Sequence, residues 1–365
     1  MAANQPSIVV MISGSGTNLQ ALIDAVANGR LPAKIVGVVS NRKAAYGLAR
    51  AEQAGISTRY LPFKPYKDVG KSRDAYDADL AAEVAAFQPD LIVLAGWMHI
   101  LSPIFLNQFA GRVINLHPAL PGQFAGTHAI ERAYDAFQRG EIEHSGCMVH
   151  VAIPEVDAGE VVVSRQVYIH KEDTLADFEA RMHEAEHELI VIAADRALMR
   201  QQGVTATNML ARVDAAWVQW QALLAQISAA HLTEPALSGG WAVKDVIAHL
   251  AWFEREMADL INQRALVGSD LWLLSIDEQN AVIYEQNRER PLPDIQAEAA
   301  QSHADMRAAL LTLDAAALQD AAYFTHMPSD WRPWEVIAGN SYEHYLDHMP
   351  SIRHWLATTF GGRND

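Results

Sequence analysis

The sequence predicts two domains of different class, an α/β domain with a mainly parallel sheet followed by an all-α four-helix bundle. The 365 residues are enough for two globular domains that each have an apolar core. Short apolar runs alternate with amphipathic segments over the first 200 residues, whereas only helical periodicity follows Gln201. Trp97 is the one tryptophan before Gln201, and the other eight of the nine lie after it. The two parts therefore differ in architecture.

The first part is expected to fold as a Rossmann-like α/β domain. Continuous Val, Ile and Leu runs bounded by Gly, Pro or Asn are typical of strands that are covered on both faces. Such runs occur at Ser7–Ile12, Lys34–Ser40, Asp90–Ala95, Arg112–Leu116, Met148–Ala152 and Val161–Tyr168. Helical segments are expected at residues 17–28, 43–54, 72–87 and 175–199. Alternating strands and helices imply right-handed crossovers and a mainly parallel sheet.

The second part is expected to be a bundle of four amphipathic helices. Apolar residues recur at three- and four-residue spacing, as in Val246, Leu250 and Phe253. The expected helices are residues 208–230, 243–264, 293–313 and 334–358. The sequence QQGVTAT has little apolar content. We therefore expect a first domain at 1–200, a linker at 201–207 and the bundle at 208–365.

Composition excludes several classes of partner. A net charge of −16, from 28 basic and 44 acidic residues, argues against nucleic acid and against an anionic membrane surface. No apolar run approaches the roughly 18 residues that a membrane helix needs. The single cysteine, Cys147, cannot form an internal disulfide and is assigned to packing. The N-terminus lacks the features of a secretion signal, so a cytoplasmic protein is expected.

A glycine-rich loop, Ser13–Asn18 (SGSGTN), directly follows the first strand and opens the first helix. Glycine lets the backbone approach an anion closely, and the first N–H groups of a helix supply hydrogen-bond donors. The loop is neither a Walker A loop nor a complete G-x-G-x-x-G fingerprint, because Leu19 occupies the position of the third glycine. It therefore indicates either a phosphate site or a structural turn.

Asn115 and His117 lie at the end of an expected strand, where ligands bind in open α/β sheets. Residues two apart in an extended segment point to the same face. There an amide can hold a developing oxyanion while an imidazole handles a proton. Asp157, in the loop between two later strands, is a candidate to orient His117, although each residue taken alone is also typical of a loop or turn.

Four motifs together give the first part a family resemblance. SGSGTN, NLHPALPG, GTHAIERA and SGCMVHVAIPEVDAGEVVV occur in the order and context typical of folate-dependent formyltransferases. Residues 7–200 resemble the phosphoribosylglycinamide formyltransferase family. The resemblance implies transfer of a formyl group from 10-formyltetrahydrofolate to glycinamide ribonucleotide in purine biosynthesis, with Asn115, His117 and Asp157 as catalytic residues. Asn115 and His117 would stabilise the oxyanion, and Asp157 would keep the imidazole protonated.

The same resemblance implies binding residues by position. It implies that Gly16, Thr17 and Asn18 bind the substrate phosphate and that Glu186 lies near the substrate's amino end. Folate contacts fall to Arg73, Met98, His99, Ile100, Leu101 and Asn115. The chain departs from the family where HPALPG, ending at Gly122, replaces the common HPSLLP and where His99 replaces a frequent arginine. These departures concern the loop rim and the affinity for folate.

Three histidines in the second part are metal-ligand candidates. His249 lies on the apolar stripe, and His344 and His348 are four apart on one helical face. Histidines from two helices can bind a divalent metal and leave one position open. The segments GWAVKDVIAHLAWFE and GNSYEHYLDHMPSIRHWL resemble the DinB-like four-helix superfamily, particularly its ClbS/DfsB branch. Many members of the superfamily hold a metal with a histidine on the second helix and an H-x-x-x-H pair on the last.

Several alternatives remain open at the level of sequence. The first domain could formylate another amine, such as that of a nucleotide sugar. The bundle could be a metal-dependent transferase, a small-molecule protection module, or a non-catalytic interaction module that forms a homodimer. The three histidines could instead be hydrogen-bonded within the core, with Trp252 as a packing residue or a pocket wall.

Overall fold

The computed structural model describes residues 5–360 except residue 267, and the chain divides into two compact units, Met1–Gln202 and Gly203–Asp365. The first unit ends with the long helix α7 (Leu175–Gln202), and the second begins with α8 (Ala206–Leu224). Gly203, at φ 81°, adopts the left-handed conformation that commonly ends a helix. The side chains of Thr205 and Asn208 form a capping box that starts α8.

The first unit contains a seven-stranded sheet in the order β3-β2-β1-β4-β5-β6-β7. The strands are β1 (Ser7–Ile12), β2 (Lys34–Ser40), β3 (Thr58–Tyr60), β4 (Leu91–Leu94), β5 (Val113–His117), β6 (His144–Val151) and β7 (Val161–Tyr168). Neighbouring strands from β3 to β5 are parallel, whereas β6 is antiparallel to both β5 and β7. The predicted α/β fold with a mainly parallel sheet is confirmed.

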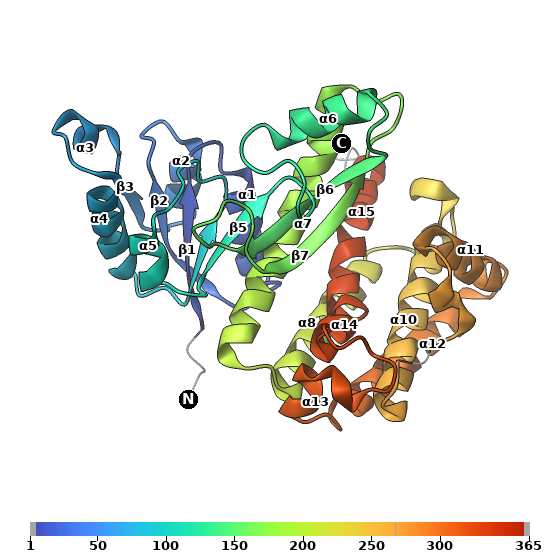
Figure 1. The fold of residues 1–365 in the computed structure, drawn as a ribbon. Helices are drawn as coiled ribbons and strands as arrows, with labels where there is room; N and C mark the ends of the chain where they lie inside the picture. Colours follow the sequence, from blue (N-terminus) through green and yellow to red (C-terminus); the bar gives the residue numbers. More distant parts are fainter. Residues whose placement is uncertain (1–4, 267, 361–365) are drawn as a thin grey trace. The chain divides into compact units, whose positions relative to one another are not determined.

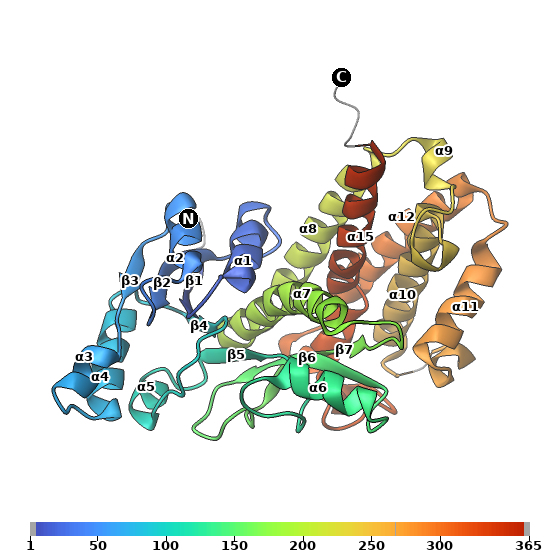
Figure 2. The same cartoon turned by 90° about the horizontal axis from the view of Figure 1, so that it is seen from above.

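Helices cover both faces of this sheet (Figures 1 and 2). They are α1 (Thr17–Ala27), α2 (Tyr46–Gln53), α3 (Lys64–Asp68), α4 (Arg73–Ala85), α5 (Pro103–Gln108), α6 (Ala129–Gln138) and α7. One apolar cluster joins α1 and α7 to one face and includes the fully buried Cys147, and the other joins α4 and α5 to the opposite face. The short elements β3, α3 and α5 were not predicted, and neither was the ten-residue helix α6.

The strand order reverses at β1, which pairs with β2 on one side and with β4 on the other. The loops that leave β1 and β4 therefore diverge, and a crevice opens at the carboxyl ends of these strands. The backbone N–H of Ser13, after β1, donates to the carbonyl of Gly96, after β4, at 3.0 Å. The fold thus places the glycine-rich loop and the segment after Gly96 side by side.

The second unit is helical, with four long helices that form the predicted bundle (Figure 2). Helix α8 contacts α12 and α15, and α10 contacts the same two helices. The helices after α8 are α9 (Ala229–Leu232), α10 (Val243–Gln263), α11 (Ile276–Asn287), α12 (Leu292–Leu310), α13 (Ala315–Gln319), α14 (Pro333–Gly339) and α15 (Tyr342–Phe360). Among the described residues, no helix has both the length and the apolar composition needed to cross a membrane.

Two of the expected long helices are broken, and the helices α11 and α13 were not predicted. The segment 208–230 ends its first helix at Leu224, and Ser228 caps the separate helix α9 by accepting from the His231 N–H. The segment 334–358 divides between α14 and α15, and Asn340 at the end of α14 donates from both its backbone N–H and its side chain to the carbonyl of Val336. Helix α11 begins after Ser275, whose side chain caps it by accepting from the Glu278 N–H.

Candidate active site

A cavity of about 400 Å³ lies at the carboxyl ends of β1, β4 and β5 in the first unit. Its walls come from the glycine-rich loop, the segment after β4, the end of β5, the loop before α6, the loop after β6, and α7. The carboxyl edge of a parallel sheet is the usual ligand position in this architecture. The cavity therefore gathers most of the residues that the sequence singled out.

The structure brings Asn115, His117 and Asp157 together in this cavity. Asn115 and His117 lie on β5, and Asp157 follows β6 in a loop. The Nδ2 atom of Asn115 donates to Oδ1 of Asp157 at 3.3 Å, and Nδ1 of His117 lies 3.4 Å from Oδ2. The Nε2 atom of His117 is buried and has no hydrogen-bond partner among the described residues. This nitrogen is free to exchange a proton with a bound molecule.

His150 also belongs to this group, although the sequence analysis did not identify it. It lies on β6 directly opposite Asn115 on β5. Its Nδ1 atom lies 3.0 Å from the carbonyl of Val151, and a carbonyl only accepts, so Nδ1 carries a hydrogen. Its Nε2 atom lies 3.2 Å from Nδ2 of Asn115 and 3.4 Å from Oδ1 of Asp157. The available signal was one polar residue within an apolar strand.

Burial and charge set the protonation of His117 and Asp157. Burial lowers the pKa of His117, and the nearby Asp157 carboxylate raises it only in part. Burial acts to raise the pKa of Asp157, but the adjacent His150 side chain and the hydrogen bond from the Gly126 N–H outweigh it and leave that pKa lowered. The site therefore combines a carboxylate with a neutral imidazole. Burial of the ring opposes the expectation that Asp157 keeps the imidazole protonated, whereas the charge of the Asp157 carboxylate acts in favour of it.

The backbone around Asp157 is tightly constrained. Asp157 adopts a left-handed φ of 53°, which is uncommon for a residue with a side chain. Gly159 packs so closely that a Cβ atom there would lie 1.8 Å from the carbonyl oxygen of Val151. The D-x-G pattern thus has a steric cause, because only glycine lets the loop return against β6 and present the Asp157 carboxylate to the cavity.

The glycine-rich loop forms another wall of the cavity, with Gly16, Thr17 and Asn18 among its lining residues. Gly16 is left-handed at φ 71° and precedes α1. A Cβ atom on Gly16 would lie 2.6 Å from Cα of Gly47, so the loop requires glycine on steric grounds as well. Glu186 of α7 also lines the cavity and lies 2.7 Å from Nδ1 of His183.

The segment Met98–Leu101 lines the cavity, whereas Arg73 does not. Arg73 instead donates to the carbonyl of Ile100 at 2.5 Å and to Asp77 at 2.9 Å, so it supports the segment from behind. His99 packs between the rings of Phe63 and Trp97, and burial lowers its pKa. Met98 and Ile100 are exposed and present apolar surface at the rim.

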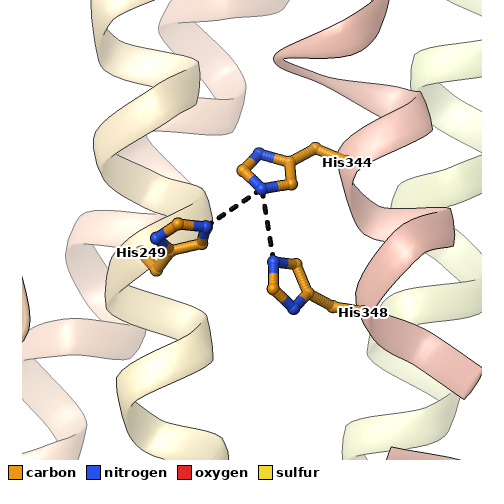
Figure 3. Close-up of side chains that lie close together, drawn as sticks. All are labelled: His249, His344 and His348. Atoms are coloured by element: carbon orange, nitrogen blue, oxygen red, sulfur yellow. Dashed lines mark hydrogen bonds between the residues drawn. The ribbon is translucent and has the colours of Figure 1, made fainter. Parts of the chain in front are cut away.

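In the second unit, the structure brings His249 of α10 together with His344 and His348 of α15 (Figure 3). The Nε2 atom of His344 lies 3.0 Å from Nε2 of His249 and 3.2 Å from Nε2 of His348. One ring nitrogen of each histidine lies within 4.8 Å of the other two. Three convergent imidazole nitrogens match the donor set of a metal centre with an open position.

The surroundings of this cluster keep two of its rings neutral. Burial lowers the pKa of His249 to about 3 and that of His344 far below its usual range, with further lowering from neighbouring histidines. A neutral imidazole is the form that ligates a metal. Phe253 packs edge-on against both His249 and His344, and the buried Trp252 packs against Phe253, so Trp252 contributes to the aromatic layer behind the cluster.

Comparison with known proteins assigns each part separately. Residues 7–194 match the formyl transferase family model. Residues 213–345 match the model of the mycothiol maleylpyruvate isomerase N-terminal domain, and the predicted DinB-like resemblance of this part is confirmed.

Individual relatives match the first part. The phosphoribosylglycinamide formyltransferase of Schizosaccharomyces pombe is 49% identical over 197 residues, which cover 51% of this chain and 94% of that protein. The enzyme of the same name from Escherichia coli K12 is 41% identical over 181 residues, 50% of this chain and 82% of that protein. The crystal structure of glycinamide ribonucleotide transformylase 1 from Symbiobacterium toebii is 36% identical, and the match covers 53% of this chain and 87% of that chain with a TM-score of 0.49. The chain belongs to the formyl transferase family, with a DinB-like segment following its formyl transferase part.

Proposed function

We propose that the first unit transfers the formyl group of 10-formyltetrahydrofolate to the amine of glycinamide ribonucleotide. The observation that carries this proposal is the cavity in which Asn115, His117 and Asp157 face both the glycine-rich loop and the segment Met98–Leu101. The names of the relatives that are 41% and 49% identical to this part agree with it. The loop would take the substrate phosphate, and the apolar rim would take the folate.

The proposed reaction conserves atoms and charge. The amine nitrogen attacks the formyl carbon, the carbonyl electron pair moves to oxygen, and a proton leaves the nitrogen. The Nδ1 atom of His117 faces the Asp157 carboxylate and carries a hydrogen, so the lone pair on Nε2 accepts that proton. The imidazolium then protonates N10 of the folate as the bond from carbon to N10 breaks and the carbonyl reforms.

Asp157 and Asn115 support the charged stage of this reaction. The Asp157 carboxylate, 3.4 Å from Nδ1, stabilises the imidazolium once His117 has taken the proton. The Asn115 amide is a hydrogen-bond donor at the same strand end and would stabilise the oxyanion. A buried site strengthens both interactions because little water competes for the charges.

The test is a formyl-transfer assay with His117→Asn beside the parent chain. We expect a decrease in kcat of roughly 100-fold or more, the usual contribution of a positioned acid or base. His170→Asn replaces an exposed histidine outside the cavity and is expected to retain parent activity. Undiminished turnover by His117→Asn would refute the proposed role. Faster reaction of a nucleotide-sugar amine than of glycinamide ribonucleotide would instead assign a different acceptor.

For the second unit we propose that His249, His344 and His348 hold one divalent metal ion. The convergence of their Nε2 atoms and the neutrality of His249 and His344 support this proposal. A bound divalent ion with an open position supplies Lewis acidity to a water or ligand molecule. The three imidazoles would hold that ion, and the apolar ring of Phe253 packs edge-on against two of them, His249 and His344.

Metal analysis of His249→Ala against the parent tests this proposal, with Co²⁺ as a spectroscopic probe. We expect the parent to bind one equivalent with visible d–d absorption and His249→Ala to lose most of the affinity. His354→Ala removes an exposed histidine of the same helix α15 and should bind as the parent does. Absence of metal from the parent after loading would show that the cluster is a hydrogen-bonded part of the core.

A further inference from the structure

The loop between β5 and α6 lines the cavity in an unfavourable backbone conformation. Phe124 and His128 adopt left-handed φ values of 42° and 57°, and Gly122 and Gly126 in the same loop are also left-handed. Side-chain-bearing residues rarely adopt this conformation, because Cβ approaches the following carbonyl. Contacts from outside the loop must therefore hold it in place.

Arg132, on α6, supplies several of these contacts. Its Nη2 atom donates to the carbonyl of Ala125 at 2.8 Å and also to that of Phe124, and its Nε atom donates to the carbonyl of His128 at 3.3 Å. The guanidinium carbon lies 5.9 Å from the centre of the Phe124 ring. Within the described part of the chain, Arg132 has backbone carbonyls as hydrogen-bond partners and no carboxylate ion pair. The contacts of the Arg132 side chain therefore stabilise the backbone conformation of the loop.

A single peptide group connects Arg132 to Asp157. The carbonyl of this group belongs to Ala125 and accepts from Arg132, and its N–H belongs to Gly126 and donates to Oδ2 of Asp157 at 2.9 Å. In a trans peptide the C=O and N–H bonds point in opposite directions, so the guanidinium and the carboxylate form hydrogen bonds on opposite sides of the peptide group. A charged donor on the carbonyl also polarises the peptide and strengthens its N–H as a donor.

We propose that Arg132 is a positioning residue for formyl transfer, which fixes the Asp157 carboxylate against His117 through the peptide group of Ala125 and Gly126. The inference rests on the proposed function of the first unit. Oδ2 of Asp157, the oxygen that accepts from Gly126, is also the oxygen 3.4 Å from Nδ1 of His117. Loss of Arg132 would therefore displace the oxygen that stabilises the imidazolium.

Two roles for Arg132 predict opposite changes at His117. The groups that act on the His117 ring are Asp157, His150, the Phe124 carbonyl and Arg132 itself. A role through charge alone predicts that removing Arg132 raises the pKa of His117, because a nearby positive charge disappears. Positioning predicts that the pKa falls, because Asp157 moves away and the effect of burial is less opposed.

The experiment compares Arg132→Ala and Arg132→Lys with the parent in the formyl-transfer assay and in an NMR titration of the His117 ring. Both variants should lose about fivefold to tenfold in kcat, the effect of one hydrogen bond, because lysine lacks the planar guanidinium that reaches the three carbonyls. The pKa of His117 should fall in Arg132→Ala. Added guanidinium ion should restore part of that variant's kcat, because Arg132 is exposed.

Arg139→Ala is the matched control, because Arg139 follows α6, is exposed and pairs with Glu141 at 2.7 Å. It should retain the kcat and the His117 titration of the parent. Parent-like kcat in Arg132→Ala, or a raised His117 pKa with full activity in Arg132→Lys, would overturn the inference. If the parent itself transfers no formyl group, the proposed function fails, while the substrate-free titration still decides whether Arg132 positions Asp157.

Discussion

Nε2 of His150 lies 3.2 Å from Nδ2 of Asn115, and the two residues face each other across the antiparallel pairing of β5 with β6. The same nitrogen lies 3.4 Å from Oδ1 of Asp157. A buried imidazole thus touches both a catalytic candidate on one strand and a catalytic candidate in the following loop. This contact fixes the Asn115 amide relative to the Asp157 carboxylate.

His150→Leu should therefore reduce kcat more than it reduces binding. Leucine keeps much of the buried volume but removes the polar side chain that lowers the pKa of Asp157, so that pKa should rise. We expect a decrease in kcat of about tenfold, measured by initial rates of formyl transfer. Met148→Leu, a buried apolar exchange on the same strand, should leave kcat unchanged. Equal losses in both variants would show a general defect of β6.

The acid limb of kcat/KM should lie below pH 6.5. Burial lowers the pKa of His117 from its usual 6.5, so the neutral imidazole persists until the pH falls through the lowered value. Asp157→Asn removes the charge that raises this pKa, so the limb of the residual activity should move to still lower pH. A pH series for both proteins tests this, and a limb above pH 6.5 in the parent would contradict it.

Folding stability should respond to the same group. Below pH 6.5 the unfolded chain protonates His117 while the folded chain does not, so the unfolding free energy decreases as pH falls through this window. The variant His117→Asn lacks this contribution to the pH dependence of the unfolding free energy. The unfolding free energy of both proteins can be measured with urea at pH 7.5 and at pH 5.5, and it should change less between the two pH values in the variant. An equal change in both proteins would count against a neutral, buried His117.

Gly159→Ala should reduce both stability and activity. A Cβ atom would meet the Val151 carbonyl oxygen at 1.8 Å, so the loop that carries Asp157 must move. We expect a loss of about 2 kcal/mol, typical of overpacking, together with a large decrease in kcat. Gly140→Ala is the control, because Gly140 is left-handed at φ 72° but has no atom within 4 Å of the new Cβ. It should cost about 1 kcal/mol of backbone strain without loss of activity.

Thr205→Ala should destabilise the start of the second unit. The Thr205 hydroxyl accepts from the Asn208 N–H at 3.2 Å, and the Asn208 side chain accepts from the Thr205 N–H at 2.9 Å. Loss of such a cap costs about 1 kcal/mol, measurable by chemical unfolding of the full chain. Asn208→Ala in the same background should add little, because the two bonds form one box. Thr358→Ala, on an exposed turn of α15, should have a smaller effect.

Strands could be predicted where the buried residues form a continuous apolar run in the sequence. Ser7–Ile12, Lys34–Ser40 and Val161–Tyr168 were predicted with the bounds that the structure shows. Strand β6 begins four residues earlier than predicted, at His144, because its first residues are polar or small. Gly146 is required there because a Cβ atom would lie 2.2 Å from the carbonyl oxygen of Arg165 on β7. That requirement depends on tertiary packing and leaves no periodic signal.

The site was predictable only in part for the same reason. Asn115 and His117 could be predicted from the sequence because residues two apart on one strand share a face. That they lie close to Asp157 could be predicted only from the family resemblance. His150 enters only through the antiparallel register of β6, which sequence does not reveal. Arg73 was expected to contact folate, and in the structure it donates to the carbonyl of Ile100 and is not among the residues that line the cavity.

The connection between the two units has a consequence for the cell. Helix α7 ends at Gln202 and α8 begins at Ala206, so three residues join the formyl transferase part to the DinB-like bundle. One messenger and one translation event therefore produce both parts, and their numbers stay equal whatever the growth conditions. Each copy of the bundle is therefore accompanied by one copy of the formyl transferase part.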